Sequence, residues 1–108
     1  MDYSWVRVAL TSTGTPSSIP VIVQGDYQIP EFPSVSVQQK QYTIRAQNGG
    51  LILEDGSKSW SLGSRFTLMR NTGNLRIKNN SYGWLNYLGN MEFRIEGSGI
   101  RLINHIHM

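Results

Sequence analysis

The sequence predicts an all-β fold: a small barrel or sandwich of about ten short, mostly antiparallel strands joined by glycine-rich hairpin turns. Apolar residues recur at every second position along most of the chain, whereas the period of a helix is nearly absent. Glycine recurs between these runs, where hairpin turns need residues that tolerate positive φ. The 108 residues fit a single β domain covering 1–108, with no segment typical of a linker.

The alternating runs are the candidate strands. Each places apolar residues on one face and polar residues on the other, which is typical of a strand with one buried side. The runs lie at 6–10, 42–46, 66–69, 75–78, 91–96 and 100–103. A shorter run at 35–41 is a further candidate, and the segments 11–18 and 30–34, rich in Ser, Thr, Gly or Pro, are expected to be loops.

Glycine-containing segments between the runs are the expected turns. They lie at 24–26, 48–50, 55–56, 72–74 and 97–99. Four stretches therefore fit the order strand, glycine turn, strand, at a spacing of about 24 residues. These predicted hairpins cover 19–29, 42–53, 66–77 and 93–102.

Composition limits the class of protein. Only 16% of residues are charged, and the polar surface is built from uncharged residues, as is common in extracytoplasmic β domains. The absence of cysteine excludes disulfides and thiol catalysis. A net charge of +3 mildly favours an anionic partner such as a cell-wall polymer or nucleic acid. No run is apolar enough to cross a membrane, and the N-terminus has no signal-peptide pattern.

Aromatic residues close to glycine are the first candidates for ligand contact. Tyr82, Trp84 and Tyr87 lie within six positions and can stack on sugar rings or nucleobases. The alternative is that they fill the core, and the core is the expected place for Trp5 and Trp60.

Basic residues on outward strand positions are the second candidates. Arg76, Lys78, Arg94 and Arg101 can form a stripe if their strands are neighbours, and such a stripe suits an anionic glycan or a single-stranded nucleic acid. The alternative is the ordinary polar face of a sheet. The predicted ligand-binding residues are thus Tyr82, Trp84, Tyr87, Arg94 and Arg101.

No residue is predicted to be catalytic. Glu92 and Glu96 fall on the wet face of a predicted strand and are expected to be surface charges. His105 and His107 share one face of a strand and could bind a metal with a third ligand, but a solvated strand end is the alternative. No metal and no cofactor are therefore expected, and no serine-nucleophile motif is present.

The order of motifs resembles the stage II sporulation protein D / amidase enhancer (SpoIID/LytB) family. Members often open with a V-R-V-x-L strand, as at 6–10, and later carry a Y-x-G-x-apolar-E-apolar strand followed by an apolar-Asn-x-apolar-x-apolar strand. The matching positions are Tyr87, Gly89, Met91, Glu92 and Phe93, then Ile103, Asn104, Ile106 and Met108.

This resemblance implies an N-terminal module of a larger extracytoplasmic cell-wall protein. The lytic members of the family are similar to transglycosylases that cut glycan strands with a glutamate, which would lie beyond Met108. The module itself would be non-catalytic. Its implied partners are peptidoglycan or another cell-wall glycan and, through the parent protein, a cell-wall amidase or sporulation proteins.

Two other functions compete with this one. The same aromatics and arginines would serve a small nucleic-acid-binding barrel, whose binding would weaken steeply with salt. A self-contained enzyme with a metal on the histidine pair is the third hypothesis. If the chain is truncated, an unpaired edge strand near 100–106 is expected, and it could drive self-association.

Overall fold

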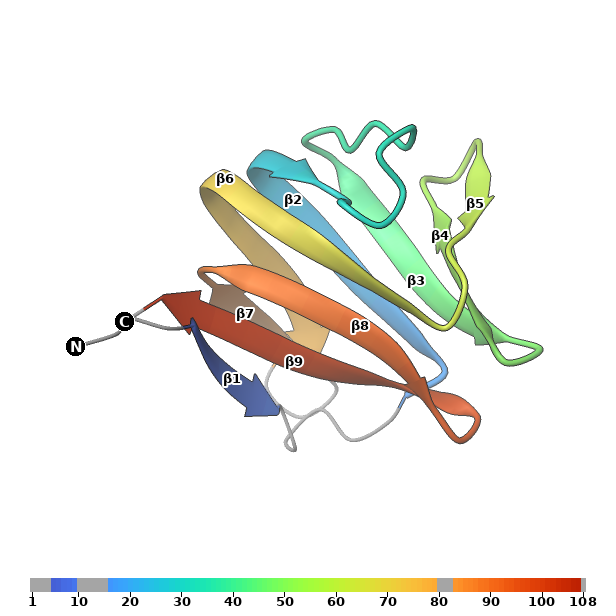
Figure 1. Cartoon of the computed structure of the whole chain (residues 1–108). Helices are drawn as coiled ribbons and strands as arrows, with labels where there is room; N and C mark the ends of the chain where they lie inside the picture. The colour runs from blue at the N-terminus through green and yellow to red at the C-terminus, as the bar shows by residue number, and fades with distance from the viewer. Residues whose placement is uncertain (1–4, 10–15, 80–82, 108) are drawn as a thin grey trace.

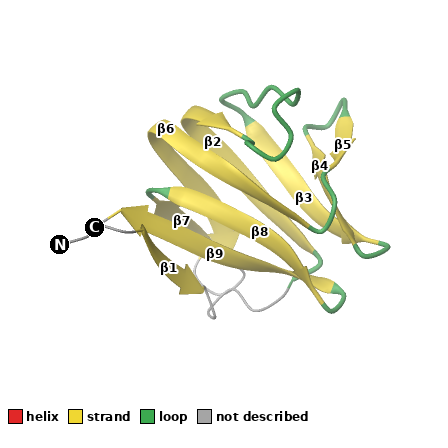
Figure 2. Ribbon diagram, in the orientation of Figure 1, coloured by secondary structure: helices red, strands yellow, loops and turns green. Residues whose placement is uncertain are grey.

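A computed structural model describes the backbone of residues 5–9, 16–79 and 83–107, and the side chains of residues 16–78 and 83–105. Nine strands and no helix are found in these ranges, so the all-β prediction is confirmed (Figure 2). The strands are β1 (Trp5–Ala9), β2 (Ser18–Gln28), β3 (Gln41–Gln47), β4 (Gly50–Glu54), β5 (Ser59–Ser61), β6 (Arg65–Asn79), β7 (Gly83–Tyr87), β8 (Asn90–Glu96) and β9 (Gly99–His107).

The strands form one antiparallel path that folds over on itself. The order is β1-β9-β8-β6-β2-β3-β4-β5, with β7 paired to β6. We call β1, β9, β8 and residues 65–68 of β6 the front sheet, since they lie nearer the viewer in Figure 1. The back sheet contains the rest of β6 with β7, β2, β3, β4 and β5.

The core lies between the two sheets and is built from the alternate positions of the strands. Ile44 and Leu53 of the back sheet are buried, as are Phe66 and Phe93 of the front sheet. The two phenyl rings stack with 5.0 Å between their centroids. Since each fully buried side chain of this size contributes about 1.5–3 kcal/mol, the alternation fixes which face of every strand points inward.

Two of the four predicted hairpins are confirmed. Residues 42–53 form β3 and β4, joined by a turn in which Asn48 (φ 53°) and Gly49 (φ 76°) both have positive φ, as a type I′ turn requires. Residues 93–102 lie in the hairpin of β8 and β9, with Gly97 at φ 62°. A turn after Asp55 also connects β4 to β5, as expected.

The other two predicted hairpins are wrong. Residues 19–28 belong to a single strand, β2, and residues 66–77 to a single strand of 15 residues, β6. Gly25 and Gly73 do not turn the chain but face each other where these strands pair. A Cβ on Gly25 would overlap the backbone of Thr72 and Gly73, so the glycines permit a close approach of two backbones.

A bulge next to this crossing allows β6 to serve both sheets. The register of β2 against β6 shifts between Asp26 and Tyr27, which leaves Asn71 as an extra residue on β6. A bulge bends a strand and increases its twist. The first part of β6 therefore pairs with β8 in the front sheet, and the later part pairs with β2 in the back sheet.

Two further expectations are corrected. The segment 35–40 is not a strand, and the Gln38 amide within it donates to the Tyr42 hydroxyl (2.9 Å). Most of the segment 100–106 is not an open edge, because β1 pairs with β9 from Ile103 to His107 and the Ile100 amide donates to the Pro16 carbonyl. In the described part of the chain there is no helix able to span a membrane.

One buried hydroxyl gives a stability prediction. Tyr27 is buried, and its hydroxyl is the one buried side-chain polar atom without a hydrogen-bond partner among the described residues. Burial raises the pKa of this phenol, an effect that the charge of Arg70 opposes. Because an unsatisfied buried group costs about 1–3 kcal/mol, Tyr27→Phe is expected to leave the free energy of unfolding unchanged or to raise it by about 1 kcal/mol in urea titrations.

The matched control is Tyr42→Phe. Tyr42 is equally buried, but its hydroxyl accepts a hydrogen bond from the Gln38 amide, so this variant is expected to lose about 1 kcal/mol. Equal losses in the free energy of unfolding of the two variants would contradict the absence of a hydrogen-bond partner for the Tyr27 hydroxyl among the described residues.

Candidate functional site: a row of arginines on the front sheet

The predicted residues Arg94 and Arg101 lie side by side on the outer face of the front sheet. Arg94 of β8 is directly opposite Arg101 of β9, and Arg65 of β6 is directly opposite Arg94 on the other side. We call these three residues the arginine row. Their neighbours Phe66, Phe93 and Leu102 point into the core, so the alternation of each strand forces the arginines outward.

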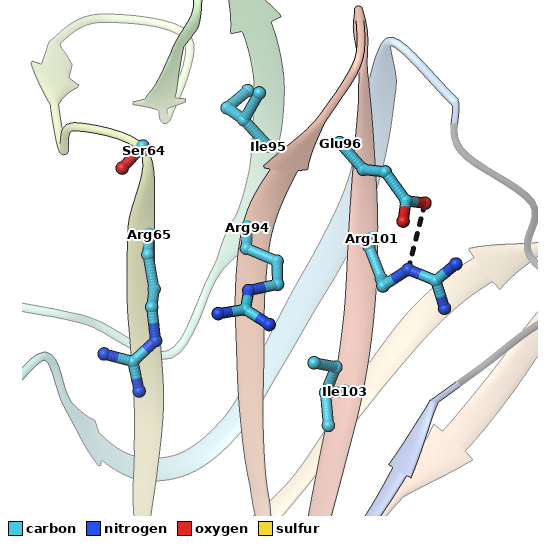
Figure 3. Close-up of a pocket in the computed structure, with 7 residues that line it drawn as sticks. All are labelled: Ser64, Arg65, Arg94, Ile95, Glu96, Arg101 and Ile103. Atoms are coloured by element: carbon cyan, nitrogen blue, oxygen red, sulfur yellow. Dashed lines mark ion pairs between the residues drawn. The ribbon is translucent and has the colours of Figure 1, made fainter.

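The arginine row lines a shallow hollow of about 600 Å³ (Figure 3). Ile95 and Ile103 add apolar surface, and Ser64 and Glu96 add polar groups at its margins. The side chains of Arg65, Arg94 and Arg101 are 50%, 43% and 33% exposed, so all three can reach a ligand.

A buried carboxylate holds the row in place. Glu92 is only 1% exposed, although it lies on the outer face of β8. Its Oε2 is 2.8 Å from Nε of Arg65 and 3.3 Å from Nε of Arg94, and its Oε1 is 2.8 Å from Nε2 of His105. The prediction of a surface charge is therefore wrong for Glu92, because side chains of the neighbouring strands cover it.

The charges around Glu92 fix its ionisation. Burial alone would raise the pKa of the Glu92 carboxyl, but hydrogen bonds from Arg65 and His105 and the charges of Arg65 and Arg94 outweigh it, so the pKa is lowered. The same hydrogen bond and charge raise the pKa of Arg65. Glu92 thus stays ionised near neutral pH and orients two of the three guanidinium groups.

The row carries little excess charge. Arg101 pairs with Glu96 through its Nε at 2.9 Å (Figure 3), and Arg65 lies 4.0 Å from Glu31 at the margin. The three guanidinium groups thus face two carboxylates, those of Glu92 and Glu96, so the net charge of the group is only +1 even before Glu31 is counted. Such a surface recognises a ligand through short directed hydrogen bonds more than through a long-range field.

The predicted aromatic group does not share this face. Trp84 pairs in register with Lys78 and points outward from the back sheet, where the guanidinium carbon of Arg76 lies 5.8 Å from its ring centre. Tyr87 faces the other way, opposite Leu75, and packs against the core. Burial raises the pKa of the Tyr87 phenol. Tyr82 lies outside the described residues.

The predicted four-residue basic stripe is therefore split. Arg76 and Lys78 lie on the part of β6 that pairs with β2 and β7, whereas Arg94 and Arg101 lie in the front sheet. Arg65, which the sequence did not single out, takes their place. Arg65 lies beside Arg94 because the first part of β6 pairs with β8, and no local sequence pattern predicts that pairing.

A second hollow, of about 420 Å³, lies at the far end of the back sheet. Trp60 of β5 lines it, together with polar residues of the segment 34–40 and of the turn after β4. We call it the Trp60 cleft. Trp60 is half-buried and packs against the core, so the expectation of a core residue holds for only part of its side chain. Trp5 belongs to residues whose side chains the structure does not describe.

The histidine pair forms no metal centre in the described side chains. His105 contacts Glu92, and the side chain of His107 is outside the described set. No group of three His, Asp or Glu residues suited to a metal ion occurs among the residues described.

Comparison of the chain with protein-family models, with curated proteins and with solved structures gave no match in any of the three. The geometry of the molecule therefore carries the functional argument, beside the resemblance noted in the sequence.

Proposed function

We propose that the chain is a non-catalytic β module that binds a cell-wall glycan, peptidoglycan in particular, as part of a SpoIID/LytB-like protein of the cell envelope. The arginine row is the observation that carries this proposal. It presents three partly exposed guanidinium groups side by side over a hollow that also contains apolar surface.

The chemistry of peptidoglycan suits this hollow. Its glycan strands carry peptides that end in carboxylates, and guanidinium groups pair with carboxylates through two parallel hydrogen bonds. Ile95 and Ile103 provide apolar contact for the methyl groups of such peptides. Since Glu92 already orients Arg65 and Arg94, little ordering cost remains when a ligand binds.

A nucleic-acid ligand is favoured less by the same features. Binding to a phosphate backbone depends on a strong positive field, and the carboxylates beside the arginine row reduce that field. Proteins that bind single-stranded nucleic acid also stack its bases on aromatic side chains, but Trp84 lies on the back sheet, away from the arginine row. Nucleic acid therefore becomes an outcome of the test below.

The test is co-sedimentation of the purified chain with insoluble peptidoglycan at low and at high salt. Wild-type protein is expected to bind at both. The double variant Arg94→Gln, Arg101→Gln is expected to bind about ten-fold more weakly, because each lost bidentate pair removes a charge-assisted contact.

The matched control is Arg76→Gln, Lys78→Gln, which removes the same charge from the outer face of the back sheet. It is expected to bind like wild type. Equal loss of peptidoglycan binding in the two double variants would overturn the proposal. Loss of all peptidoglycan binding at high salt, together with binding of the chain to single-stranded DNA at low salt, would also overturn it, in favour of general attraction to polyanions.

A further inference from the structure

The Trp60 cleft is formed by two segments that lie far apart in the sequence. The connection between β2 and β3 contributes Ser34, Ser36 and Lys40, and the turn between β4 and β5 contributes Ser57 and Lys58. Trp60 forms the apolar part of the wall. Hydroxyl and ammonium groups thus lie beside one partly buried indole.

The acidic group in this cleft is already fully engaged. The Asp55 carboxylate accepts hydrogen bonds from the amides of Ser57 (2.9 Å) and Lys58 (2.8 Å) and from the Lys40 ammonium (3.1 Å). These backbone amides, followed by the bond from Lys40, lower the pKa of Asp55 to about 2. Asp55 therefore ties the two segments together and fixes the turn, and it is not an open acceptor for a cation.

The aromatic wall is also fixed. The ring of Trp60 packs against that of Tyr42, with 6.4 Å between centroids and 57° between planes. The Tyr42 hydroxyl in turn accepts the Gln38 amide hydrogen at 2.9 Å. The indole and the polar segment beside it are thus held by the same residue, so the cleft is formed before any ligand arrives.

We propose that the Trp60 cleft binds an uncharged pyranose unit of a saccharide. A pyranose ring has an apolar C–H face, which suits the part of the Trp60 indole that lines the cleft, and a rim of hydroxyls that both donate and accept hydrogen bonds. The serine hydroxyls and the ammonium groups supply partners for that rim. The site is separate from the arginine row and does not depend on the carboxylates that the row is proposed to bind.

The test is titration of the ¹⁵N-labelled chain with a soluble oligomer of N-acetylglucosamine, followed by amide chemical shifts. Wild-type protein is expected to show saturable shifts confined to residues 34–42 and 55–60. Trp60→Leu, which keeps apolar volume against the core but removes the aromatic face, is expected to weaken binding about ten-fold.

Two controls keep the result interpretable. Ser36→Ala with Ser57→Ala removes hydroxyls at exposed positions with no effect on packing, and it is also expected to weaken binding. This double variant provides the test if Trp60→Leu fails to fold. Trp84→Ala, which removes a tryptophan from the other end of the back sheet, is expected to bind like wild type. The Arg94→Gln, Arg101→Gln variant should also bind this neutral oligomer normally, which separates the cleft from the function proposed above. Absence of shifts in the cleft, or shifts that Trp60→Leu leaves unchanged, would overturn the proposal.

Discussion

Gly25→Ala is expected to reduce the free energy of unfolding by about 3 kcal/mol, because the added methyl group has no room at the crossing of β2 and β6. The new Cβ would overlap the carbonyl of Thr72 and the Cα of Gly73, which are backbone atoms of the paired strand. No rotamer change can remove such a clash, so β2 and β6 must separate at their crossing. Urea unfolding followed by tryptophan fluorescence measures the loss.

Gly50→Ala is the matched control for this effect. Gly50 also lies in a strand, and a Cβ there would meet its nearest atoms at 3.7 Å, an ordinary contact. This variant is expected to be as stable as wild type. If Gly25→Ala were equally well tolerated, the close approach of the two backbones would not be what the glycine provides.

Glu92→Gln is expected to reduce the free energy of unfolding by about 2 kcal/mol at neutral pH. The variant keeps the size of the side chain but removes the charge that Arg65, Arg94 and His105 share. Breaking a fully buried ion pair costs more, but both arginines are about half-exposed and can turn to water.

The pH dependence of stability identifies the cause of that loss. Because the pKa of Glu92 is lowered below its ordinary value of 4.5, its ionised form stabilises the folded state fully above about pH 4.5. The contribution is lost as the pH falls through the lowered pKa. The difference in stability between wild type and Glu92→Gln is therefore expected to shrink as the pH falls below about 4.5.

Glu96→Gln serves as the comparison for this experiment. Glu96 pairs with Arg101, but its side chain is 47% exposed, so the loss is expected to stay below about 1 kcal/mol. A difference between wild type and Glu92→Gln that persists unchanged at acid pH would show that side-chain shape, and not charge, makes Glu92 important.

Much of the fold follows from two local signals. Alternation predicted which face of β3, β8 and β9 is buried, and the glycines at 48–50 and 97–99 predicted two hairpins correctly. The same signal failed at Gly25 and Gly73, because glycine serves a tight turn and a close backbone approach equally well. Only the partner strand distinguishes the two uses, and the partner is distant in sequence.

The candidate site was predictable only in part for a related reason. Arg94 and Arg101 belong to one hairpin, so their proximity follows from local sequence. Arg65 joins them through the pairing of β6 with β8, in which it bonds to Glu92, 27 positions further along the chain, and no local pattern specifies that pairing. The burial of Glu92 likewise depends on side chains from three strands, so alternation alone placed it on the correct face but in the wrong environment.

The long strand β6 has a consequence for how the two proposed binding surfaces act together. Arg65 begins β6, and Trp60 lies just before it, joined by a segment in which Leu62 is buried and the backbone of Leu62 and Gly63 is bonded to Leu51. The two surfaces are therefore set at a constant separation by folded backbone. For a polymer long enough to touch both surfaces, the distance between the two contacts would be fixed by the protein. The second contact would therefore form at a high effective concentration, without the cost of ordering a flexible linker.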